Sequence, residues 1–486
     1  RWARVLHDAG VGEGDTVVTM QPNTIRAYEV WMGVAMLGAI EVPVNTEYVG
    51  RLLQHVVDNS EARVMVVAEQ FAGQVAETAD RFAGLDLVLL SDARHASSWS
   101  ATSVTCESGL ALFEKAQPYD EGRRFEPWDI SMILYTSGTT GPSKGVITPW
   151  AQFHEATIGS APAHAYRTER SVLYSPYPTF HVSGKIPFYG TALGGGRMVL
   201  RKRFSTKAFW EDIRAHGCTS TLLMGATANF VYRQPERRDD ADNPLEIIIF
   251  SPWIPEIEEF KRRFDVTGCS VFNMTEISAP IVSGWDGEII EDPRSCGRAR
   301  PGFDLRVVDD HDRQLPPGTV GELVVRADDP WKLMAGYWRM PDKTVEAWRN
   351  LWFHTGDLFS VDEAGNYTFE GRKKDAIRRR GENISASEVE EAALEHPAIL
   401  EAAAVAVPDE LSEEEVKLVV TVRPGMELDR DEYEDFLASR LPRFMVPRYV
   451  EVLPEMPKTP TEKIQKSELR AAGVGQDTWD RTDGSR

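Results

Sequence analysis

The sequence predicts an α/β protein with a large N-terminal domain and a small α+β C-terminal domain. From residue 15 to about 192, β-rich runs alternate with helical stretches, which is the pattern of a doubly wound fold. A second alternation of the same kind follows, and short strands with turns then dominate residues 297–367. We therefore expect two doubly wound α/β subdomains and a small β-barrel or sheet, followed by the compact C-terminal domain.

The individual elements follow from hydrophobic periodicity and turn residues. In chain order they are a helix around Trp2 that ends at the glycines of 10–14, strand 16–20, helix 25–37, strands 62–67, 85–90 and 171–175, helix 204–216, strands 218–223, 246–250, 270–272, 303–308, 321–326 and 367–370, helix 387–394 with a Ser387/Glu390 capping box, strands 401–407 and 416–422, and helix 429–439. The domain boundary is expected at Lys374, which gives domains 1–373 and 374–486. The chain begins at Arg1 within a helical pattern, so we expect the natural N-terminus to precede it.

Composition excludes several classes of protein. The 486 residues are 42% hydrophobic and 27% charged, which is typical of a globular protein with sizeable cores. Lys and Arg number 54 against 75 Asp and Glu, and the net charge of −21 argues against nucleic acid as a partner. The four widely spaced cysteines indicate neither a disulfide framework nor a zinc site, so we expect a reducing, cytoplasmic setting. The apolar runs are far shorter than the roughly 20 residues that span a bilayer.

Residues 135–145 read Tyr-Thr-Ser-Gly-Thr-Thr-Gly-Pro-Ser-Lys-Gly and form the most informative segment of the chain. Glycines let the backbone approach a ligand, hydroxyls donate hydrogen bonds, and Lys144 supplies a compact positive charge. The residues that we expect to bind phosphate are Thr136, Ser137, Gly138, Thr139, Thr140, Gly141 and Lys144. The spacing fits neither a Walker P-loop nor a dinucleotide fingerprint, and a plain surface turn is the alternative.

Four later segments give this loop a context. They are Phe-Asn-Met-Thr-Glu at 272–276, His-Thr-Gly-Asp at 354–357, the glycine-bounded stretch 371–381, and Pro-Lys-Thr-Pro-Thr-Glu-Lys-Ile-Gln-Lys at 457–466. Taken in this order, the five segments resemble the core motifs of the adenylate-forming superfamily, which groups acyl- and aryl-CoA synthetases, firefly luciferase and nonribosomal adenylation domains. Details such as Gly-Pro-Ser-Lys in the loop look most like the carnitine/crotonobetaine-CoA ligase branch.

The resemblance implies an acid–thiol ligase that works in two steps. A carboxylic acid and ATP would give an acyl-adenylate and pyrophosphate, and CoA would then give acyl-CoA and AMP, with Mg²⁺ as the cofactor. Lys463 would stabilise the charge that develops on the acyl and α-phosphate oxygens, and a solvated lysine is the alternative. Thr275 would donate to the α-phosphate, and Glu276 would offer a hard carboxylate oxygen to Mg²⁺.

The resemblance also assigns the remaining nucleotide contacts. Phe272 would present a ring to adenine, and Asn273, which stands where most members have glycine, would place an amide nearby. Asp357 would accept hydrogen bonds from the ribose hydroxyls, with Arg372 as a donor beside it. Glu462 replaces a glycine that most members have before the lysine, and we expect its side chain to face solvent.

The resemblance further implies that the small domain is mobile and turns about a hinge at Lys374 between the two half-reactions. Gly381 would then border the pantetheine tunnel, and the arginines of 378–380, Arg379 among them, would meet the CoA phosphates; a solvated charged face is the alternative. In the acyl pocket, His181 would act as a gate, with a structural histidine as the alternative. Gly225, Trp253 and Met274 would form walls, and an inward Trp253 would favour a small or medium acyl group.

Three other functions stay open. A standalone adenylation enzyme would load a separate carrier protein, a luciferase-like oxygenase would keep every adenylation residue, and a nucleotide-binding pseudoenzyme would bind ATP without turnover. The expected partners are a small carboxylic acid, ATP and CoA, without nucleic acid or a membrane span. The identity of the acid is open, and a homodimer stays open beside a monomer.

Overall fold

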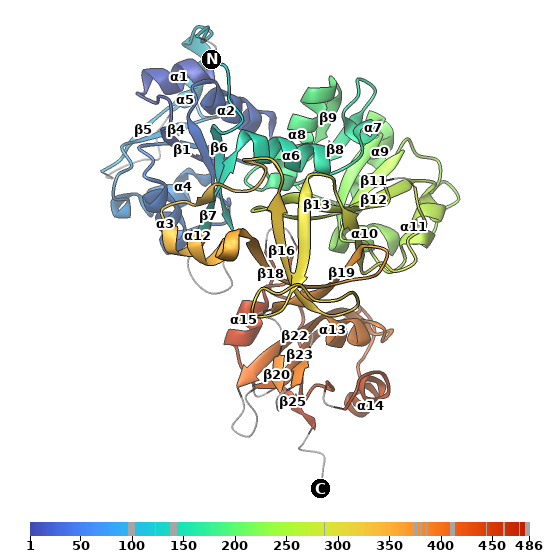
Figure 1. Ribbon diagram of the computed structural model, residues 1–486. Helices are drawn as coiled ribbons and strands as arrows, with labels where there is room; N and C mark the ends of the chain where they lie inside the picture. The colour runs from blue at the N-terminus through green and yellow to red at the C-terminus, as the bar shows by residue number, and fades with distance from the viewer. Residues whose placement is uncertain are drawn as a thin grey trace. The chain divides into compact units, whose positions relative to one another are not determined.

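The computed structural model describes residues 1–95, 103–121, 123–136, 143–285, 287–373, 377–379, 382–384, 386–408, 414–443, 445–459, 462–475 and 477–481. The chain separates into two compact units, which Figure 1 colours by position along the chain. The larger unit comprises residues 1–304 and 325–353, and the smaller unit comprises residues 305–324 and 354–486. Lys374 lies outside the described residues, so a boundary at that residue stays a prediction.

The first sheet of the larger unit has the strand order β17-β7-β6-β2-β1-β3-β4-β5. Its strands from β6 to β5 pair in parallel, and β7 runs antiparallel to β6. Successive residues of β1 pack into different hydrophobic clusters, Val17 in one and Val18 in the other, so both faces of this sheet are covered. The bounds are β1 Thr16–Met20, β2 Ile40–Pro43, β3 Val64–Val67, β4 Leu87–Leu90, β5 Thr105–Glu107, β6 Ile130–Thr136, β7 Lys144–Pro149 and β17 Gly336–Tyr337, with α1 Trp2–Asp8, α2 Ile25–Met36, α3 Gly50–Ser60, α4 Ala72–Ala76, α5 Gly109–Lys115 and the 3₁₀ turns Glu69–Phe71 and Ala79–Arg81.

The second α/β region of the larger unit has the strand order β14-β13-β12-β11-β10-β8-β9. Strands β8, β10, β11 and β12 are parallel, so their carboxyl ends meet at one edge of the sheet, where such folds bind ligands. The bounds are β8 Val172–Ser175, β9 Arg197–Leu200, β10 Ser220–Met224, β11 Ile247–Ser251, β12 Thr267–Met274, β13 Ser278–Ser283 and β14 Ser295–Ala299, with α6 Trp150–Gly159, α7 Ala163–Tyr166, α8 Val182–Gly194, α9 Thr206–His216, α10 Gly225–Tyr232 and α11 Ile257–Phe264. Helix α12 Pro341–Ala347, which is followed by the 3₁₀ turn Arg349–Leu351, packs beside β17 of the first sheet.

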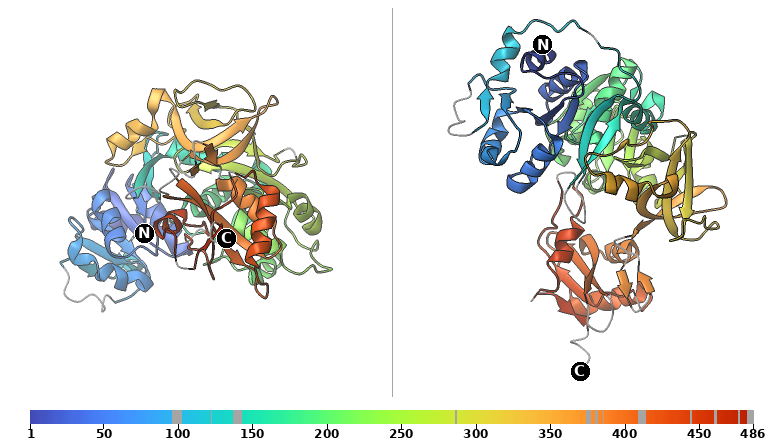
Figure 2. Two further views of the ribbon diagram at one scale, coloured as in Figure 1. Left: turned by 90° about the horizontal axis from the view of Figure 1, so that it is seen from below. Right: turned by 60° about the vertical axis from the view of Figure 1, so that its left-hand side comes forward.

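The smaller unit ends in a four-stranded sheet of order β22-β23-β24-β25, which can be followed from orange to red in Figure 2. Alternate residues of β22 face two clusters: Ala402 and Ala404 pack with α13 and α14, whereas Ala403 and Val405 pack with α15. Helices therefore cover both faces. The bounds are β15 Phe303–Val308, β16 Gly321–Ala327, β18 Phe353–Val361, β19 Asn366–Arg372, β20 Ile377–Arg379, β21 Glu382–Ile384, β22 Ile399–Pro408, β23 Glu414–Val422, β24 Tyr449–Val452 and β25 Trp479–Asp480, with α13 Ala386–Leu394, α14 Arg430–Arg440 and α15 Lys466–Ala471.

Three predictions from the sequence can be compared with the structure of this unit. The capping box at Ser387 and Glu390 is wrong, because α13 begins at Ala386 and Ser387 lies inside the helix. The Glu390 carboxylate instead accepts a hydrogen bond of 2.6 Å from the Ala404 amide, which ties α13 to β22. Helix α14 begins at Arg430, one residue after the predicted start at Asp429, whose side chain caps the helix by accepting from the Glu432 amide at 2.9 Å. Of the barrel or sheet expected around 297–367, strands β15, β16, β18 and β19 follow one another in a single sheet.

Two further features concern membrane-spanning helices and cysteines. None of the helices that the structure describes has the length and apolar character needed to cross a membrane. Cys106, Cys218, Cys269 and Cys296 are all free thiols.

Candidate active site

The glycine-rich segment joins the ends of β6 and β7. Thr136 on β6 and Lys144 on β7 are cross-strand partners, and the Thr136 hydroxyl donates to the Lys144 carbonyl at 3.4 Å. The predicted residues Ser137, Gly138, Thr139, Thr140 and Gly141 lie outside the described residues. The structure therefore defines the two strands that hold the predicted phosphate loop.

The short strand β17 adds a residue that the sequence prediction missed. Tyr337 lies with its ring centroid 4.0 Å from the Lys144 ammonium, and its hydroxyl donates to a Glu276 carboxylate oxygen at 3.0 Å. Burial raises the pKa of Tyr337, and the neighbouring Glu276 charge raises it further, so the hydroxyl stays a donor. The dipeptide Gly336-Tyr337 matches no chemical motif by itself, and only the fold brings it to both predicted residues.

The segment Phe272 to Glu276 forms the end of β12 and the turn after it. A register shift between Phe272 and Met274 marks a β-bulge at Asn273, where the ladder to β13 is interrupted. Phe272, Asn273, Met274 and Thr275 are half-buried, whereas Glu276 is 8% exposed. Two hydrogen bonds to its carbonyls hold the turn: the Gln152 side-chain amide donates to the Thr275 carbonyl at 2.7 Å, and the Met334 backbone amide donates to the Glu276 carbonyl at 2.9 Å.

The donor set around Glu276 suits a metal that is held mainly by other ligands. Within the described ranges, no group of three or more His, Cys, Asp and Glu side chains could hold a metal ion. Mg²⁺ in nucleotide sites takes one or two protein carboxylates and completes its shell with substrate phosphates and water. A single buried carboxylate fits that mode, and it does not fit a cage made of protein ligands alone.

The predicted acyl-pocket segments follow neighbouring parallel strands. Met224 at the end of β10 pairs with Ser251 at the end of β11, and Gly225 packs against Pro252. The buried Tyr177 hydroxyl joins these segments, because it accepts from the Met224 amide at 3.1 Å and donates to the Leu222 carbonyl at 3.3 Å. Burial raises the pKa of Tyr177 to about 12. Tyr177 thus anchors the turn that carries Gly225.

His181 and Trp253 occupy positions that a structural role explains. His181 is the N-cap of α8, where its Nδ1 accepts from the Ser183 amide at 3.2 Å. The Trp253 indole is 5% exposed, packs on Phe250 at 5.3 Å between ring centroids, and donates to the Ser283 hydroxyl at 3.3 Å. Trp253 is therefore a core residue, and the expectation that it shortens the acyl pocket has no support from its packing.

In the smaller unit, Asp357 on β18 and Arg372 on β19 are cross-strand partners. The Arg372 Nε lies 3.3 Å from an Asp357 carboxylate oxygen; the Asp357 side chain is 5% exposed, and that of Arg372 is 45% exposed. Within β18, Gly356 directly before Asp357 has a left-handed backbone, with φ of 70°, a conformation that favours glycine. The two residues predicted to act beside each other at the ribose therefore form an ion pair.

Lys463 lies in the electrostatic field of that pair. Lys463 is exposed to solvent as a residue. The protein around its ammonium nevertheless partly desolvates that group, which lowers the pKa of Lys463. The Arg372 charge lowers this pKa further, and the Asp357 charge raises it. The neighbouring lysines are different, because Lys458 lies 2.7 Å from Glu401 and Lys466 lies 2.6 Å from Glu390.

The residue before Lys463 shows why a glycine suits this position. Glu462 has φ of 63°, in the left-handed region, where a side chain costs about 1 kcal/mol relative to glycine. Its side chain is 47% exposed, as predicted, and lies 3.6 Å from the Lys458 ammonium. The turn is closed by hydrogen bonds between Thr459 and Lys463, with the Thr459 amide 2.8 Å from the Lys463 carbonyl.

The predicted CoA-binding arginine has a structural role in this conformation. Arg379 is 7% exposed, its Nε lies 2.7 Å from the buried Glu415 carboxylate, and its Nη1 donates to the Val446 carbonyl at 3.2 Å. This guanidinium is not a solvated charge facing a ligand, so we correct its assignment to CoA. Gly381 and the hinge residue Lys374 lie outside the described residues.

A charged cluster that the sequence prediction missed lies next to the predicted hinge. The Lys373 ammonium lies 2.9 Å from Asp310 and 3.2 Å from Glu322, and Glu322 is 3.3 Å from a His354 ring nitrogen. The same Glu322 carboxylate accepts from the Gly356 amide at 3.1 Å. These contacts lower the pKa of Glu322 despite its burial. Glu322 thus connects the β18 backbone next to Asp357 to Lys373, the residue that precedes the predicted hinge.

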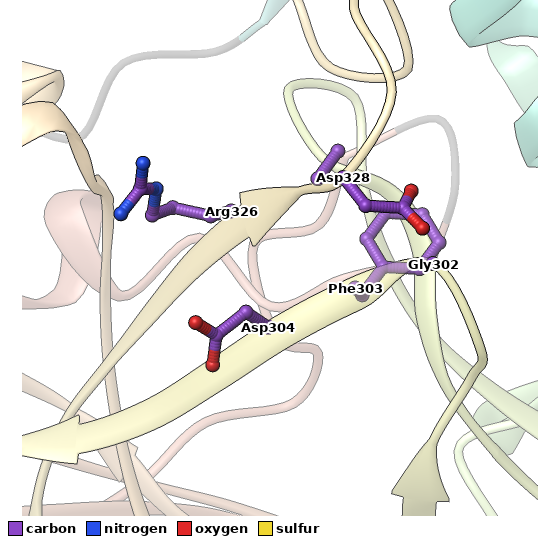
Figure 3. A pocket seen from close by; sticks show the side chains of 6 residues that line it. Gly302, Phe303, Asp304, Arg326 and Asp328 are labelled. Atoms are coloured by element: carbon purple, nitrogen blue, oxygen red, sulfur yellow. The ribbon is translucent and has the colours of Figure 1, made fainter.

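A shallow hollow of about 390 Å³ is lined by Gly302, Phe303, Asp304, Arg326, Ala327 and Asp328 (Figure 3). Figure 3 shows the Asp304 and Asp328 carboxylates and the Arg326 guanidinium around it. Among the described residues that we predicted for nucleotide, metal or acyl binding, none lines this hollow. We therefore do not assign the candidate site to it.

Comparison with known proteins identifies the family of the chain. The model of the AMP-binding enzyme family matches residues 1–338, and that of the AMP-binding enzyme C-terminal domain matches residues 388–463. Crotonobetaine/carnitine–CoA ligase from Salmonella heidelberg is 27% identical over 97% of this chain and 91% of its own. Sulfoacetate–CoA ligase from Cupriavidus necator is 30% identical over 95% of this chain and 88% of its own.

Solved structures give the same result at the level of the fold. The crystal structure of ATP-bound MatB from Rhodopseudomonas palustris superposes with a TM-score of 0.85 at 25% identity, over 97% of this chain and 91% of that chain. The o-succinylbenzoate CoA synthetase of Bacillus subtilis, solved with its acyl-adenylate intermediate, shares the fold with a TM-score of 0.83 at 21% identity, over 98% of this chain and 92% of that chain. The resemblance inferred from the five motifs is confirmed, and the chain belongs to the AMP-binding enzyme family.

Proposed function

We propose that the protein is an ATP-dependent acyl-CoA ligase that forms an acyl-adenylate and then transfers the acyl group to CoA. The observation that carries this proposal is the Asp357–Arg372 ion pair, whose charges act on Lys463 although Lys463 lies more than a hundred residues from Asp357 in the sequence. A lysine in the field of a nucleotide-binding acid–base pair suits charge stabilisation during adenylation. The two curated relatives described above are CoA ligases, which supports the same reaction.

In the larger unit, the β6–β7 hairpin binds the phosphates that leave as pyrophosphate. The Thr136 hydroxyl and the Lys144 ammonium contribute from its two strands, and the five loop residues between them complete the grip. Phe272 and Asn273 bind the adenine, Thr275 donates to the α-phosphate, and Glu276 offers a carboxylate oxygen. When bound at Glu276, Mg²⁺ neutralises part of the phosphate charge.

In the smaller unit, Asp357 accepts from the ribose hydroxyls and Arg372 orients that carboxylate and donates beside it. Lys463 meets the acyl carboxylate and the α-phosphate oxygens and stabilises their extra negative charge in the transition state. The hinge at Lys374 then allows the second half-reaction, in which the CoA thiol attacks the acyl carbon and AMP leaves. Gly381 borders the path of the thiol arm in this proposal.

The acyl pocket is formed by the segments after β8, β10, β11 and β12. His181, Gly225 and Met274 are the residues that we retain from the prediction, with Tyr177 as the anchor of the Gly225 turn. The protein is placed in the cytoplasm, where its four free thiols stay reduced. A homodimer remains a proposal, and light scattering in solution tests it.

The experiment that tests the function measures pyrophosphate release across a panel of carboxylic acids, with and without CoA, followed by mass spectrometry of the products. We expect ATP-dependent release with at least one acid and an acyl-CoA product when CoA is present. Absence of release with every acid would refute the enzymatic function. An acyl-adenylate that reacts with a phosphopantetheinylated carrier protein and not with CoA would instead support a standalone adenylation enzyme.

A further inference from the structure

We propose that Tyr337 is a positioning residue of the adenylation half-reaction, which holds the Glu276 carboxylate and the Lys144 ammonium in their working orientations. The inference rests on the proposed function and extends it to a residue that the five motifs do not contain. It is based on one side chain that contacts both a predicted metal ligand and a predicted phosphate ligand.

The backbone around Tyr337 is fastened on two sides. The Met334 amide donates to the Glu276 carbonyl at 2.9 Å, and the Trp338 amide donates to the Gly145 carbonyl at 2.7 Å. Between them, Tyr337 pairs with Val146 in the β7–β17 ladder. Residues 334–338 therefore bridge the strand that carries the phosphate loop and the turn that carries Glu276.

The hydroxyl of Tyr337 acts on Glu276. Tyr337 is 5% exposed and Glu276 is 8% exposed, so their hydrogen bond of 3.0 Å is shielded from water. A neutral donor on one carboxylate oxygen restricts rotation of the group without cancelling its charge. The Glu276 carboxylate is thereby held ready to bind a cation that it shares with the substrate phosphates.

The ring of Tyr337 acts on Lys144. The ammonium lies 4.0 Å from the ring centroid, within the range of a cation–π interaction. This contact stabilises one rotamer of a long, flexible side chain at the start of β7, next to the loop. An aromatic side chain without a hydroxyl keeps this second role and loses the first, which allows the two to be separated.

Three substitutions test the proposal. Tyr337→Phe removes only the hydroxyl, and Tyr337→Leu removes the ring as well. The matched control is Tyr174→Phe, because Tyr174 is also buried and its hydroxyl also donates to a carboxylate, that of Asp212 at 3.1 Å, outside the proposed site. Thermal unfolding of all three identifies any general loss of stability.

The primary readout is binding of a nonhydrolysable ATP analogue with Mn²⁺, measured by calorimetry and by the electron paramagnetic resonance of the free ion. We expect Tyr337→Phe to weaken Mn²⁺-dependent binding about tenfold, the scale of one lost hydrogen bond to a charged group, and to leave binding in EDTA unchanged. Tyr337→Leu should also weaken binding in EDTA, by about threefold. Tyr174→Phe should match the wild type in both conditions.

A double-mutant cycle distinguishes positioning from a structural effect. If the Tyr337 hydroxyl works through Glu276, then Tyr337→Phe should change Mn²⁺-dependent binding less than about twofold in a Glu276→Gln background. An undiminished effect in that background would overturn the proposal, as would a folded Tyr337→Phe protein that binds like the wild type. Failure of the wild type to release pyrophosphate with any acid would refute the proposed function instead, so the two failures are distinguishable.

Discussion

The two predicted functional lysines sit in different kinds of environment. Lys144 is half-buried at the start of a strand, with its ammonium over the Tyr337 ring and its carbonyl hydrogen-bonded to Thr136. Lys463 lies in a tight turn, keeps exposed surface, and has a lowered pKa because of desolvation and Arg372. Lys144 is therefore part of a β-sheet, whereas Lys463 lies in a short segment that is held by hydrogen bonds to Thr459.

This difference separates the two tasks of an adenylating enzyme. Gripping phosphates that are present in the ground state requires fixed geometry, which the β6, β7 and β17 ladder supplies to Lys144. Negative charge that develops only in the transition state is stabilised by a cation whose interaction with the substrates is stronger in the transition state than in the ground state. We therefore expect Lys463 to govern the rate of adenylation and Lys144 to govern the affinity for ATP.

The largest expected effect tests the role of Lys463. Lys463→Ala should lower the rate of pyrophosphate release by about two to three orders of magnitude, because one transition-state charge partner is lost. Thioester formation from supplied acyl-adenylate should continue. Lys458→Ala is the matched control, since Lys458 lies in the same turn and pairs with Glu401, and it should stay within about twofold of the wild type. Equal losses in both half-reactions of a folded Lys463→Ala protein would contradict the assigned role.

The second prediction concerns the proposed rotation of the C-terminal domain, which carries Lys463, about the hinge at Lys374. Lys374→Pro should restrict rotation at the hinge and slow the thioester step about tenfold or more, while adenylation changes less. Single-turnover measurements of the two half-reactions check this. Lys373→Ala controls for the loss of a lysine at this point and removes its contacts with Asp310 and Glu322. An unchanged overall turnover in Lys374→Pro would remove the hinge from the mechanism.

The third prediction concerns Lys144. Lys144→Met should raise KM for ATP about tenfold with a smaller change in kcat, because a contact made equally in the ground and transition states affects binding more than rate. Methionine keeps most of the length and the apolar stem of the side chain but removes the ammonium, so the cation–π contact with Tyr337 is lost together with the charge. Steady-state kinetics at saturating acid measure the split. A fall in kcat comparable to that of Lys463→Ala would mean that the two lysines share one task.

The smallest effect is a shift in pH dependence. A lysine whose pKa is below its usual value of 10.5 is charged at lower pH and loses its proton as the pH rises through that lowered pKa. The adenylation kcat/KM should therefore fall at the alkaline end, with an apparent pKa below 10.5. In Lys463→Arg the guanidinium does not deprotonate, and this alkaline fall should disappear from the residual activity. A fall at the same pH in both proteins would assign it to another group.

Much of the fold could be predicted because its signals are local. Hydrophobic periodicity predicted strand β1 and helix α9, and it placed helix α14 to within one residue at each end. The predicted capping box at Ser387 is wrong because serine and glutamate at this spacing also occur inside the first turns of a helix. The Glu390 carboxylate on α13 accepts a hydrogen bond from the Ala404 amide on β22 instead. Local pattern cannot distinguish a cap from a tertiary hydrogen bond.

For the candidate site, too, some features could be predicted from the sequence and others only from the tertiary structure. The sequence by itself determined the chemistry, because Lys144, Glu276, Asp357, Arg372 and Lys463 stand in motifs whose residue types suit phosphate, metal, ribose and a developing charge. Only the tertiary structure decided the pairings: Tyr337 with Glu276 and Lys144, Arg379 with Glu415, and Trp253 with the core. The physical reason is that a motif specifies which atoms are available, whereas burial and side-chain direction depend on strands that are distant in the chain.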